Sequence, residues 1–342
     1  MLRKIDYLKY LDDCWRQHLK PKPATAPTVI STFAGCGGSS LGYSMAGFRE
    51  LLAVEWDDNA TETFKLNFPE VPVYHGDIAK LSVAECLSLT GIKEGELDVF
   101  DGSPPCQGFS TAGKRQIDDN RNQLFREYVR LLRGLKPKVF VMENVSGMVK
   151  GLMKTLFVEI LRELKASGYK VSARVLNAMY YGVPQSRQRI IFIGVREDLG
   201  IEPSHPKGWS VPPTLKDAIK TISPSNEIQP NVSPLRKSRW EETKKGHAHR
   251  ERFSLLRTDW NRPVPTILKV SGSGGHFHPD EPRLLTVIEL AYCASFHGEY
   301  RFIGGWDNAV KRIGNSVPPL FMKSIAEHIK ANILDHAPQN PL

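Results

Sequence analysis

Residues 28–42 read TVISTFAGCGGSSLG, and their pattern indicates an α/β fold. A run of β-branched residues leads into a glycine-rich turn and then into a segment that can form a helix. In α/β proteins such a turn brings the backbone close to a nucleotide. Gly35 and Gly37 match the opening of the GxGxxG fingerprint, although Ser40 stands where its last glycine belongs. The turn therefore predicts either a nucleotide site or a tight structural turn.

The alternation of strand and helix continues from this stretch to about residue 196. The expected strands are LLAVEW (51–56), VPVYHG (71–76), LDVFDGS (97–103), KVFVMENV (138–145), VSARVLNA (171–178) and IIFIGV (190–195). The expected helices are NATETFKLNF (59–68), LFREYVRLLRGL (124–135) and MKTLFVEILRELKASG (153–168). Repeated β–α units predict a parallel sheet with helices packed on its faces.

Changes in composition and periodicity along the sequence divide the chain into four segments. Residues 1–27 hold an amphipathic helix, expected over residues 2–19, and a Pro-rich linker; residues 28–196 form the α/β domain; residues 197–282 form a smaller, irregular domain; residues 283–342 return to the first domain as helices. The third segment is rich in Pro, Ser, Lys, Arg and Trp and has weak periodicity. We therefore expect an α/β fold with a second, smaller domain.

The chain of 342 residues has a net charge of +9, which suits a polyanionic partner. Nine Lys or Arg residues and only four Asp or Glu residues lie between Leu235 and Arg262, so the excess of positive charge is concentrated in the third segment. A charged surface that simply faces solvent is the alternative interpretation. The five cysteines are odd in number and form no CxxC pair, as expected in a reducing cytosol. We expect no membrane span and no metal, and we assign His276 and His278 to a loop role.

Acidic residues follow two of the expected strands. Glu55, beside Trp56, ends the second strand, where an acidic side chain can hold two ribose hydroxyls. Asp77, beside Ile78, closes the third strand in the same way. These carboxylates suit an adenosine ligand, although solvated carboxylates are common at strand ends.

Cys106 stands out in the segment GSPPCQGFS (102–110). The segment follows the fourth strand, so the thiol is presented at the ligand-binding edge of the sheet, where it can act as a nucleophile. Glu143 in VMENV ends the next strand on the same edge, where it can donate or accept a proton. Arg187 and Arg189 alternate in QSRQRIIFIG and are expected on one face of a strand that enters the site; arginines that protect a strand edge are the alternative.

Taken in order, FAGCGG, VEW, GDI, GSPPCQGFS, MENV, QSRQR and RIGNSVPP resemble the characteristic blocks of the DNA (cytosine-5)-methyltransferases over residues 28–334. The resemblance implies a Rossmann-like sheet of the S-adenosylmethionine-dependent type, and it makes residues 197–282 a target-recognition domain. It also implies double-stranded DNA as the partner. The short chain is similar to bacterial or phage modification enzymes, which suggests a cytoplasmic, nucleoid-associated monomer and a possible cognate restriction endonuclease.

The resemblance also assigns roles to individual residues. Cys106 would be the nucleophile, Glu143 its partner at the cytosine ring, and Arg187 and Arg189 the anchors of a flipped base. S-adenosylmethionine would be held by Phe33, Gly35, Gly37, Glu55, Trp56, Asp77, Ile78, Leu124, Asn315 and Ser316. DNA would be contacted by Gln107, Ser110, Lys114, Arg121, Arg236, Lys237 and Arg239.

One block departs from the family pattern. Ile288, Tyr292 and Ala294 stand where similar proteins usually carry Arg, Arg and Gln, so we expect the recognition domain to pack differently. Three other functions are compatible with parts of the sequence: a nicotinamide-dependent oxidoreductase, a tRNA methyltransferase on the same architecture, and a DNA-binding module without activity. The recognition sequence and the role of the N-terminal helix are not readable from these residues.

Overall fold

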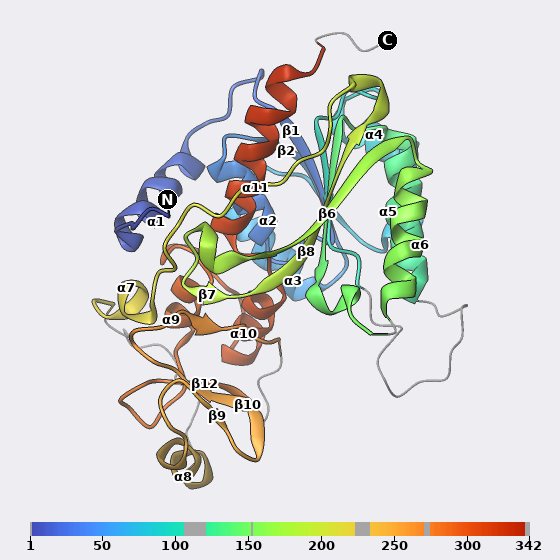
Figure 1. The fold of residues 1–342 in the computed structure, drawn as a ribbon. Coiled ribbons are helices and arrows are strands. Elements are labelled where there is room, and N and C mark those ends of the chain that lie inside the picture. Colours follow the sequence, from blue (N-terminus) through green and yellow to red (C-terminus); the bar gives the residue numbers. More distant parts are fainter. Residues whose placement is uncertain (1, 106–120, 152, 223–232, 270–273, 339–342) are drawn as a thin grey trace.

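The computed structural model describes residues 2–105, 121–151, 153–222, 233–269 and 274–338. Within them, a seven-stranded sheet with the order β3-β2-β1-β4-β5-β8-β6 forms the centre (Figure 1). Its strands are β1 (Thr28–Thr32), β2 (Arg49–Glu55), β3 (Val73–His75), β4 (Val99–Gly102), β5 (Val139–Val145), β6 (Tyr169–Asn177) and β8 (Gln188–Arg196). The predicted α/β fold is confirmed.

The direction of one strand corrects the predicted parallel sheet. The first five strands in the order of the sheet, β3, β2, β1, β4 and β5, run parallel to one another. Strand β8 pairs antiparallel with both β5 and β6. The reason is the short connection after β6, which passes through β7 (Gln185–Ser186) and leaves no room for a crossover helix. Strand β8 therefore runs back between β5 and β6.

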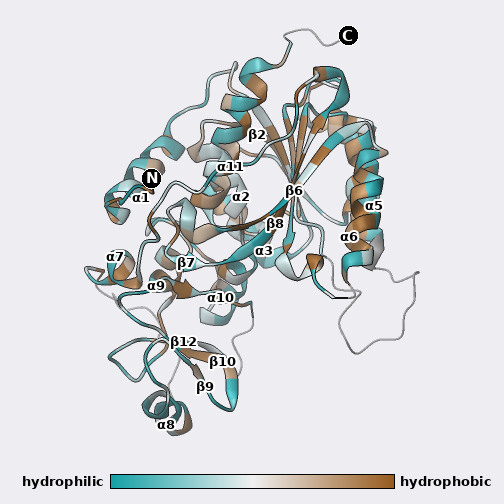
Figure 2. Cartoon of the chain, in the orientation of Figure 1, coloured by the Kyte–Doolittle hydropathy of each residue, from teal (hydrophilic) through white to brown (hydrophobic). Residues whose placement is uncertain are grey.

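The helices form two layers, one on each face of the sheet. α4, α5 and α6 cover one face, and α2, α3 and α11 cover the other (Figure 1). Period-two alternation within the strands assigns the faces: Val139 and Val141 join one apolar cluster, while Phe140 and Met142 join the other. Figure 2 shows these central strands as hydrophobic, as expected for a sheet covered on both sides. The helices are α1 (Tyr7–Leu19), α2 (Gly38–Met45), α3 (Asp58–Asn67), α4 (Val83–Thr90), α5 (Arg121–Leu135), α6 (Met153–Lys165), α7 (Leu215–Ile219), α8 (Pro234–Glu242), α9 (Val287–Cys293), α10 (Trp306–Asn315) and α11 (Pro319–Asn332).

The N-terminal helix starts later than the apolar spacing predicts. It begins at Tyr7, because the Asp6 side chain accepts a hydrogen bond from the Lys9 amide and caps the first turn. Residue Arg3 instead forms an isolated bridge with Ser210. The segment before the helix is thus tied to the start of the third segment of the chain.

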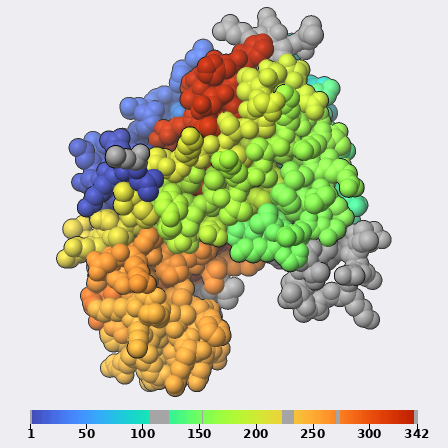
Figure 3. Space-filling view, viewed as in Figure 1, coloured from blue at the N-terminus to red at the C-terminus, as the bar shows by residue number. Residues whose placement is uncertain are grey.

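The first part of the third segment lies against the α/β domain, where the amides of Trp209 and Ser210 donate hydrogen bonds to the Tyr180 carbonyl. The later part, over residues 233–269 and 274–282, forms a lobe, seen in orange at the bottom of Figure 3. Its short strands β9 (Ala248–His249), β10 (Arg252–Arg257) and β12 (Gly275–Phe277) form one sheet, and β11 (Val264–Pro265) pairs with β7. The helix α11 then packs on α2, which returns the C-terminal segment to the first domain.

A buried carboxyl group on strand β2, that of Glu50, predicts how the stability of the protein depends on pH. Burial, partly opposed by a hydrogen bond of 2.9 Å from Ser40 Oγ, raises the pKa of Glu50 from 4.5 to about 8. The folded state holds this proton more tightly than the unfolded chain, so this contribution to stability is lost as the pH rises from 4.5 through about 8. Glu50→Gln should remove up to about 1.4 kcal/mol per pH unit of this decline.

Urea unfolding at several pH values within that window measures the effect as the free energy of unfolding. Glu62→Gln, a change at an exposed position on α3, is the control and should leave the decline as it is in the unaltered chain. Equal declines in the unaltered chain and in Glu50→Gln would contradict the assignment.

Candidate active site

A cavity of about 820 Å³ lies at the carboxyl ends of β1, β2, β4 and β5. In open α/β sheets this edge is where ligands bind. The sequence-predicted residues that line it are Phe33, Gly35, Glu55, Trp56, Asp77, Ile78, Leu124, Glu143, Arg187, Arg189, Asn315 and Ser316. Residues from widely separated blocks of the sequence thus meet in one cavity.

The glycine-rich turn forms one wall with a left-handed backbone. Phe33 has a φ of 55°, Gly35 of 58° and Gly37 of 94°. A side chain at φ > 0 costs free energy, so Phe33 is held there by its surroundings. Gly37 was predicted to contact a ligand, but it lies behind the lining: a Cβ there would stand 2.6 Å from Phe68 Cε2. Gly38 lines the cavity instead.

The carboxylate of Glu55 joins this turn to the end of β2. Its Oε2 accepts a hydrogen bond of 2.8 Å from the Gly35 amide, and its Oε1 accepts bonds of 3.0 and 2.9 Å from the amides of Trp56 and Asp57. The adjacent Trp56 side chain is 75% exposed at the cavity rim. The site therefore offers an exposed aromatic face next to a fixed carboxylate.

Asp77 and Leu124 lie farther along the lining. Asp77 caps the 3-10 helix η1 (Ile78–Lys80) by accepting a hydrogen bond of 3.0 Å from the Ala79 amide. This cap fixes the carboxylate of an exposed residue in the lining of the cavity. Leu124 comes from the first turn of α5 and contributes apolar surface.

Glu143 and Arg189 form an ion pair at the sheet edge, with Arg189 Nε 2.7 Å from Glu143 Oε1. The register explains the pair: Glu143 lies opposite Ile191 in the β5–β8 ladder, so Arg189 is its diagonal neighbour on the same face. Only 13% of the Arg189 side chain and 11% of the Glu143 side chain are exposed. A pair this well shielded interacts more strongly than one in open solvent.

Arg187 does not share a regular strand with Arg189, which corrects the predicted alternation. It lies between β7 and β8, is 2% exposed, and donates hydrogen bonds to the carbonyls of Ile267 (3.2 Å) and Gly314 (3.0 Å). Burial, and then the like charge of Arg189, lowers the pKa of Arg187, whereas Glu143 opposes that shift. Its Nε has no partner among the described residues.

The described chain leads directly to the candidate nucleophile. Ser103, Pro104 and Pro105 line the cavity, and Asn144 Nδ2 donates a hydrogen bond of 3.0 Å to the Pro104 carbonyl. Cys106 follows, but it lies outside the described residues, as do Gln107, Ser110 and Lys114. Arg121 begins α5, and its side chain is not described either.

A charged cluster in the lining was missed by the sequence reasoning. Asp57 caps α3 and accepts hydrogen bonds from Arg312 (2.9 Å) and Lys311 (3.2 Å). Burial alone would raise the pKa of Asp57, but bonds from the Ala60 amide and from these two cations hold it at about 2. The available signal was the N-cap position of Asp57; its partners, more than 250 residues away, could not be read from the chain.

The predicted DNA-contacting residues Arg236, Lys237 and Arg239 lie on α8, in the separate lobe and outside the cavity. In the block that departs from the family pattern at Ile288, Tyr292 and Ala294, the carbonyl of Tyr292 accepts a hydrogen bond from the Tyr7 hydroxyl of α1. The predicted loop role is wrong for His276, which lies within β12 with its Nε2 3.1 Å from the Pro265 carbonyl. His278 follows that strand, and its Nδ1 accepts a hydrogen bond from the Asp280 amide.

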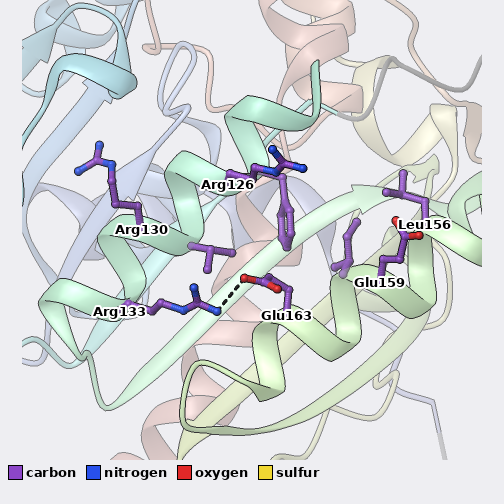
Figure 4. Close-up of a pocket in the computed structure, with 9 residues that line it drawn as sticks. Arg126, Arg130, Arg133, Leu156, Glu159 and Glu163 are labelled. Atoms are coloured by element: carbon purple, nitrogen blue, oxygen red, sulfur yellow. Dashed lines mark hydrogen bonds and ion pairs between the residues drawn. The ribbon is translucent and has the colours of Figure 1, made fainter. Parts of the chain in front are cut away.

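A second hollow, of about 530 Å³, lies between α5 and α6 (Figure 4). Arg133 and Glu163 bridge it at 2.7 Å, with about half of each side chain exposed. It is lined by these two helices and not by strand ends, so it does not belong to the site at the sheet edge. None of the helices in the described part of the chain has the length and apolar character that a bilayer span requires.

Comparison with known proteins matches residues 27–331 to the family model described as C-5 cytosine-specific DNA methylase. The chain is 35% identical to the Type II methyltransferase M1.HphI of Haemophilus parahaemolyticus over 88% of this chain and 86% of that protein. It is 33% identical to the Type II methyltransferase M.NgoPII of Neisseria gonorrhoeae over 93% of this chain and 99% of that protein.

Among solved structures, a protein described as a DNA modification methyltransferase encoded within an E. coli prophage superposes with a TM-score of 0.78 and 25% identity, covering 90% of this chain and 100% of that chain. DNMT2 of Spodoptera frugiperda superposes with a TM-score of 0.65 and 20% identity over 89% of this chain and 99% of that chain, which concerns the fold alone. The predicted Rossmann-like methyltransferase sheet is confirmed.

Proposed function

We infer that this chain, which belongs to the C-5 cytosine-specific DNA methylase family, methylates carbon 5 of cytosine in double-stranded DNA with S-adenosylmethionine as the donor. Because its relatives are named Type II methyltransferases, we further propose that it is the modification enzyme of a Type II restriction–modification system. In this proposal it acts on nucleoid DNA in the cytoplasm as a monomer, and a cognate endonuclease belongs to the same system. The observation that carries the proposal is the meeting of Glu143, Arg187 and Arg189 with the Phe33–Glu55 wall in one cavity.

The cavity has the groups that an adenosyl ligand requires. The wall at Gly35 is open, since a Cβ there would meet no atom within 4 Å, and a ligand can approach the backbone closely. Phe33 and Trp56 would flank the adenine, Glu55 would accept hydrogen bonds from the ribose hydroxyls, and Asp77 would accept one from the adenine amine. When bound, S-adenosylmethionine supplies an electrophilic methyl group.

Cytosine carbon 5 needs activation before it can accept a methyl group. In the proposed reaction the Cys106 thiolate adds to carbon 6, and the electron pair of the ring double bond becomes available at carbon 5. Glu143 would share a proton with ring nitrogen 3 and so balance the charge, in a position that Arg189 fixes from 2.7 Å. The methyl group would pass to carbon 5 as its bond to the donor sulfur breaks, and the electron pair of that bond would stay on the sulfur as a thioether. Loss of the carbon-5 proton to water and expulsion of the Cys106 thiolate would then restore the ring.

Arg187 and Arg189 have different tasks in this proposal. Arg189 orients the Glu143 carboxylate, whereas Arg187 is held by the carbonyls of Ile267 and Gly314 and keeps one N–H without a partner among the described residues. A guanidinium so placed can donate to the cytosine carbonyl or to a nearby phosphate. The base must leave the helix to reach these groups, at a cost of a few kcal/mol.

Incorporation of radiolabelled methyl groups tests this function. We expect label from S-adenosylmethionine in duplex DNA of mixed sequence and none above background in tRNA. Transfer to tRNA alone would favour the tRNA methyltransferase, and tight binding of a nicotinamide dinucleotide without binding of S-adenosylmethionine would favour the oxidoreductase. A chain that binds DNA but leaves it unlabelled would be a module without activity.

The basic residues on α8 predict a salt-dependent affinity for DNA. Replacing Arg236, Lys237 and Arg239 together by glutamine should weaken DNA binding and reduce the slope of log affinity against log salt by up to about 3, because each lost phosphate contact removes roughly 0.9 from that slope. Fluorescence anisotropy with a labelled duplex at several salt concentrations measures both quantities.

The matched control neutralises three exposed lysines of the N-terminal segment, Lys4, Lys9 and Lys20. It changes the net charge by the same amount on a part of the molecule far from α8 (Figure 1). A salt slope reduced equally in both triple variants would show a general effect of net charge and would remove α8 from the interface.

A further inference from the structure

We propose that the N-terminal helix α1 positions the glycine-rich turn of the donor cavity, acting through an aromatic support made of Trp15, His18, Phe68 and Tyr300. The family match begins at residue 27, so α1 lies outside it. The inference rests on the proposed function, because it takes the cavity to be the site of S-adenosylmethionine. Three steps of direct contact lead from α1 to the turn.

The first step fastens α1 to two other segments. Trp15 Nε1 donates a hydrogen bond of 3.0 Å to Glu299 Oε2, and the Trp15 ring stacks on His297 with centroids 4.9 Å apart and an interplanar angle of 11°. His18 Nδ1 lies 2.8 Å from Ser44 Oγ, on the helix α2 that follows the glycine-rich turn. Both rings are buried, whereas Glu299 is exposed, so α1 is fastened at the edge of the core.

The second step carries the contact to Phe68 and Tyr300. The His18 ring meets Phe68 edge to face at 5.4 Å, and Trp15 meets Tyr300 in the same manner at 6.4 Å. Phe68 and Tyr300 in turn lie 6.3 Å apart, centroid to centroid. Aromatic rings prefer such offset and edge-on arrangements, and each pair adds to the rigidity of the group.

The third step reaches the turn itself. The Tyr300 hydroxyl donates a hydrogen bond to the carbonyl of Cys36. A Cβ at Gly37 would lie 2.6 Å from Phe68 and 2.9 Å from the Tyr300 oxygen, so the aromatic support touches the back of the turn directly. The opposite side of the turn, at Gly35, faces the cavity.

The support holds a turn whose backbone is left-handed at three residues, of which Gly35 and Gly37 adopt that conformation without steric cost. Phe33 in particular carries a side chain at a φ of 55°, a conformation that persists only when the surrounding structure holds it. A turn that is already held loses little freedom when a ligand binds, and this preorganisation favours affinity. We therefore assign Tyr300 and Trp15 as positioning residues for the donor site rather than as catalytic residues.

Tyr300→Phe tests the inference, since it removes the hydrogen bond to Cys36 and keeps the ring. The loss of one hydrogen bond should raise the Kd for S-adenosylmethionine about threefold to tenfold. The Kd for DNA and kcat at saturating donor should stay within about twofold, because the change affects only the free energy of donor binding. Calorimetric titration of the full chain with S-adenosylmethionine, together with steady-state kinetics, measures these quantities.

Tyr10→Phe is the matched control, because it removes a partly buried hydroxyl of α1 that faces Lys323 and not the turn. It should leave the Kd for the donor unchanged. Trp15→Leu should weaken donor binding at least as much as Tyr300→Phe does. If Trp15→Leu fails to fold, the Kd of Tyr300→Phe for S-adenosylmethionine still tests the inference.

Two failures can be told apart. If Tyr300→Phe binds the donor as tightly as the unaltered chain and only its melting temperature falls, the aromatic support is merely structural and the inference is overturned. If the unaltered chain itself does not bind S-adenosylmethionine, the proposed function falls, and this inference with it.

Discussion

Cys106→Ser should abolish turnover while leaving DNA binding intact. The serine hydroxyl is a much weaker nucleophile than a thiolate, so addition to carbon 6 of the ring should become the limiting step. We expect methyl transfer to fall by at least about a thousandfold, as found when the nucleophile of a catalytic unit is removed. Labelled methyl incorporation gives kcat, and anisotropy with a duplex gives the Kd for DNA.

Cys86→Ala is the control, since Cys86 is a buried thiol on α4 whose pKa is raised to about 11 by burial. It should retain nearly full activity, because a thiol in the core is not available as a thiolate. Near-normal turnover in Cys106→Ser would refute the nucleophile assignment.

Glu143→Gln should produce the second large loss, about a hundredfold to ten-thousandfold in kcat. Glutamine keeps the shape of the side chain, but it cannot share a proton with ring nitrogen 3 and it leaves Arg189 without its carboxylate partner. Donor binding should not change, because Glu55 and the glycine-rich turn form a different wall of the cavity. Single-turnover kinetics at saturating donor and DNA measures the chemical step.

The control, Glu163→Gln, breaks an ion pair of the same length, 2.7 Å to Arg133, in the hollow between α5 and α6 (Figure 4). Because this pair is largely exposed, its loss should cost at most about 1 kcal/mol of stability and none of the activity. A Glu143→Gln enzyme within tenfold of the unaltered one would exclude Glu143 from the proton transfer.

Much of the fold is readable from the sequence because the pattern is local. The apolar runs that lead to Thr32, Glu55 and Val145 predict the strands of a covered sheet, and the residues that follow them share one edge by the geometry of parallel strands. Glu55 and Glu143 could therefore be placed in the same cavity before the structure was known.

Other features depend on contacts between distant segments. The residues of β8 do not themselves reveal that it runs antiparallel to β5 and β6, and the place of Arg187 is set by carbonyls at Ile267 and Gly314. Gly37 was expected at the ligand, yet its lack of a side chain serves the contact with Phe68 and Tyr300 behind the turn. The lobe with β9, β10 and β12 was anticipated only as irregular, because strands of two to six residues leave almost no periodicity.

Bisulfite sequencing of mixed-sequence duplex DNA, after incubation with the purified chain and S-adenosylmethionine, tests the central claim most directly. We expect cytosines to be protected from conversion in one recurring sequence context and converted everywhere else. Complete conversion of every cytosine in DNA that has been exposed to folded, donor-binding protein would contradict the account.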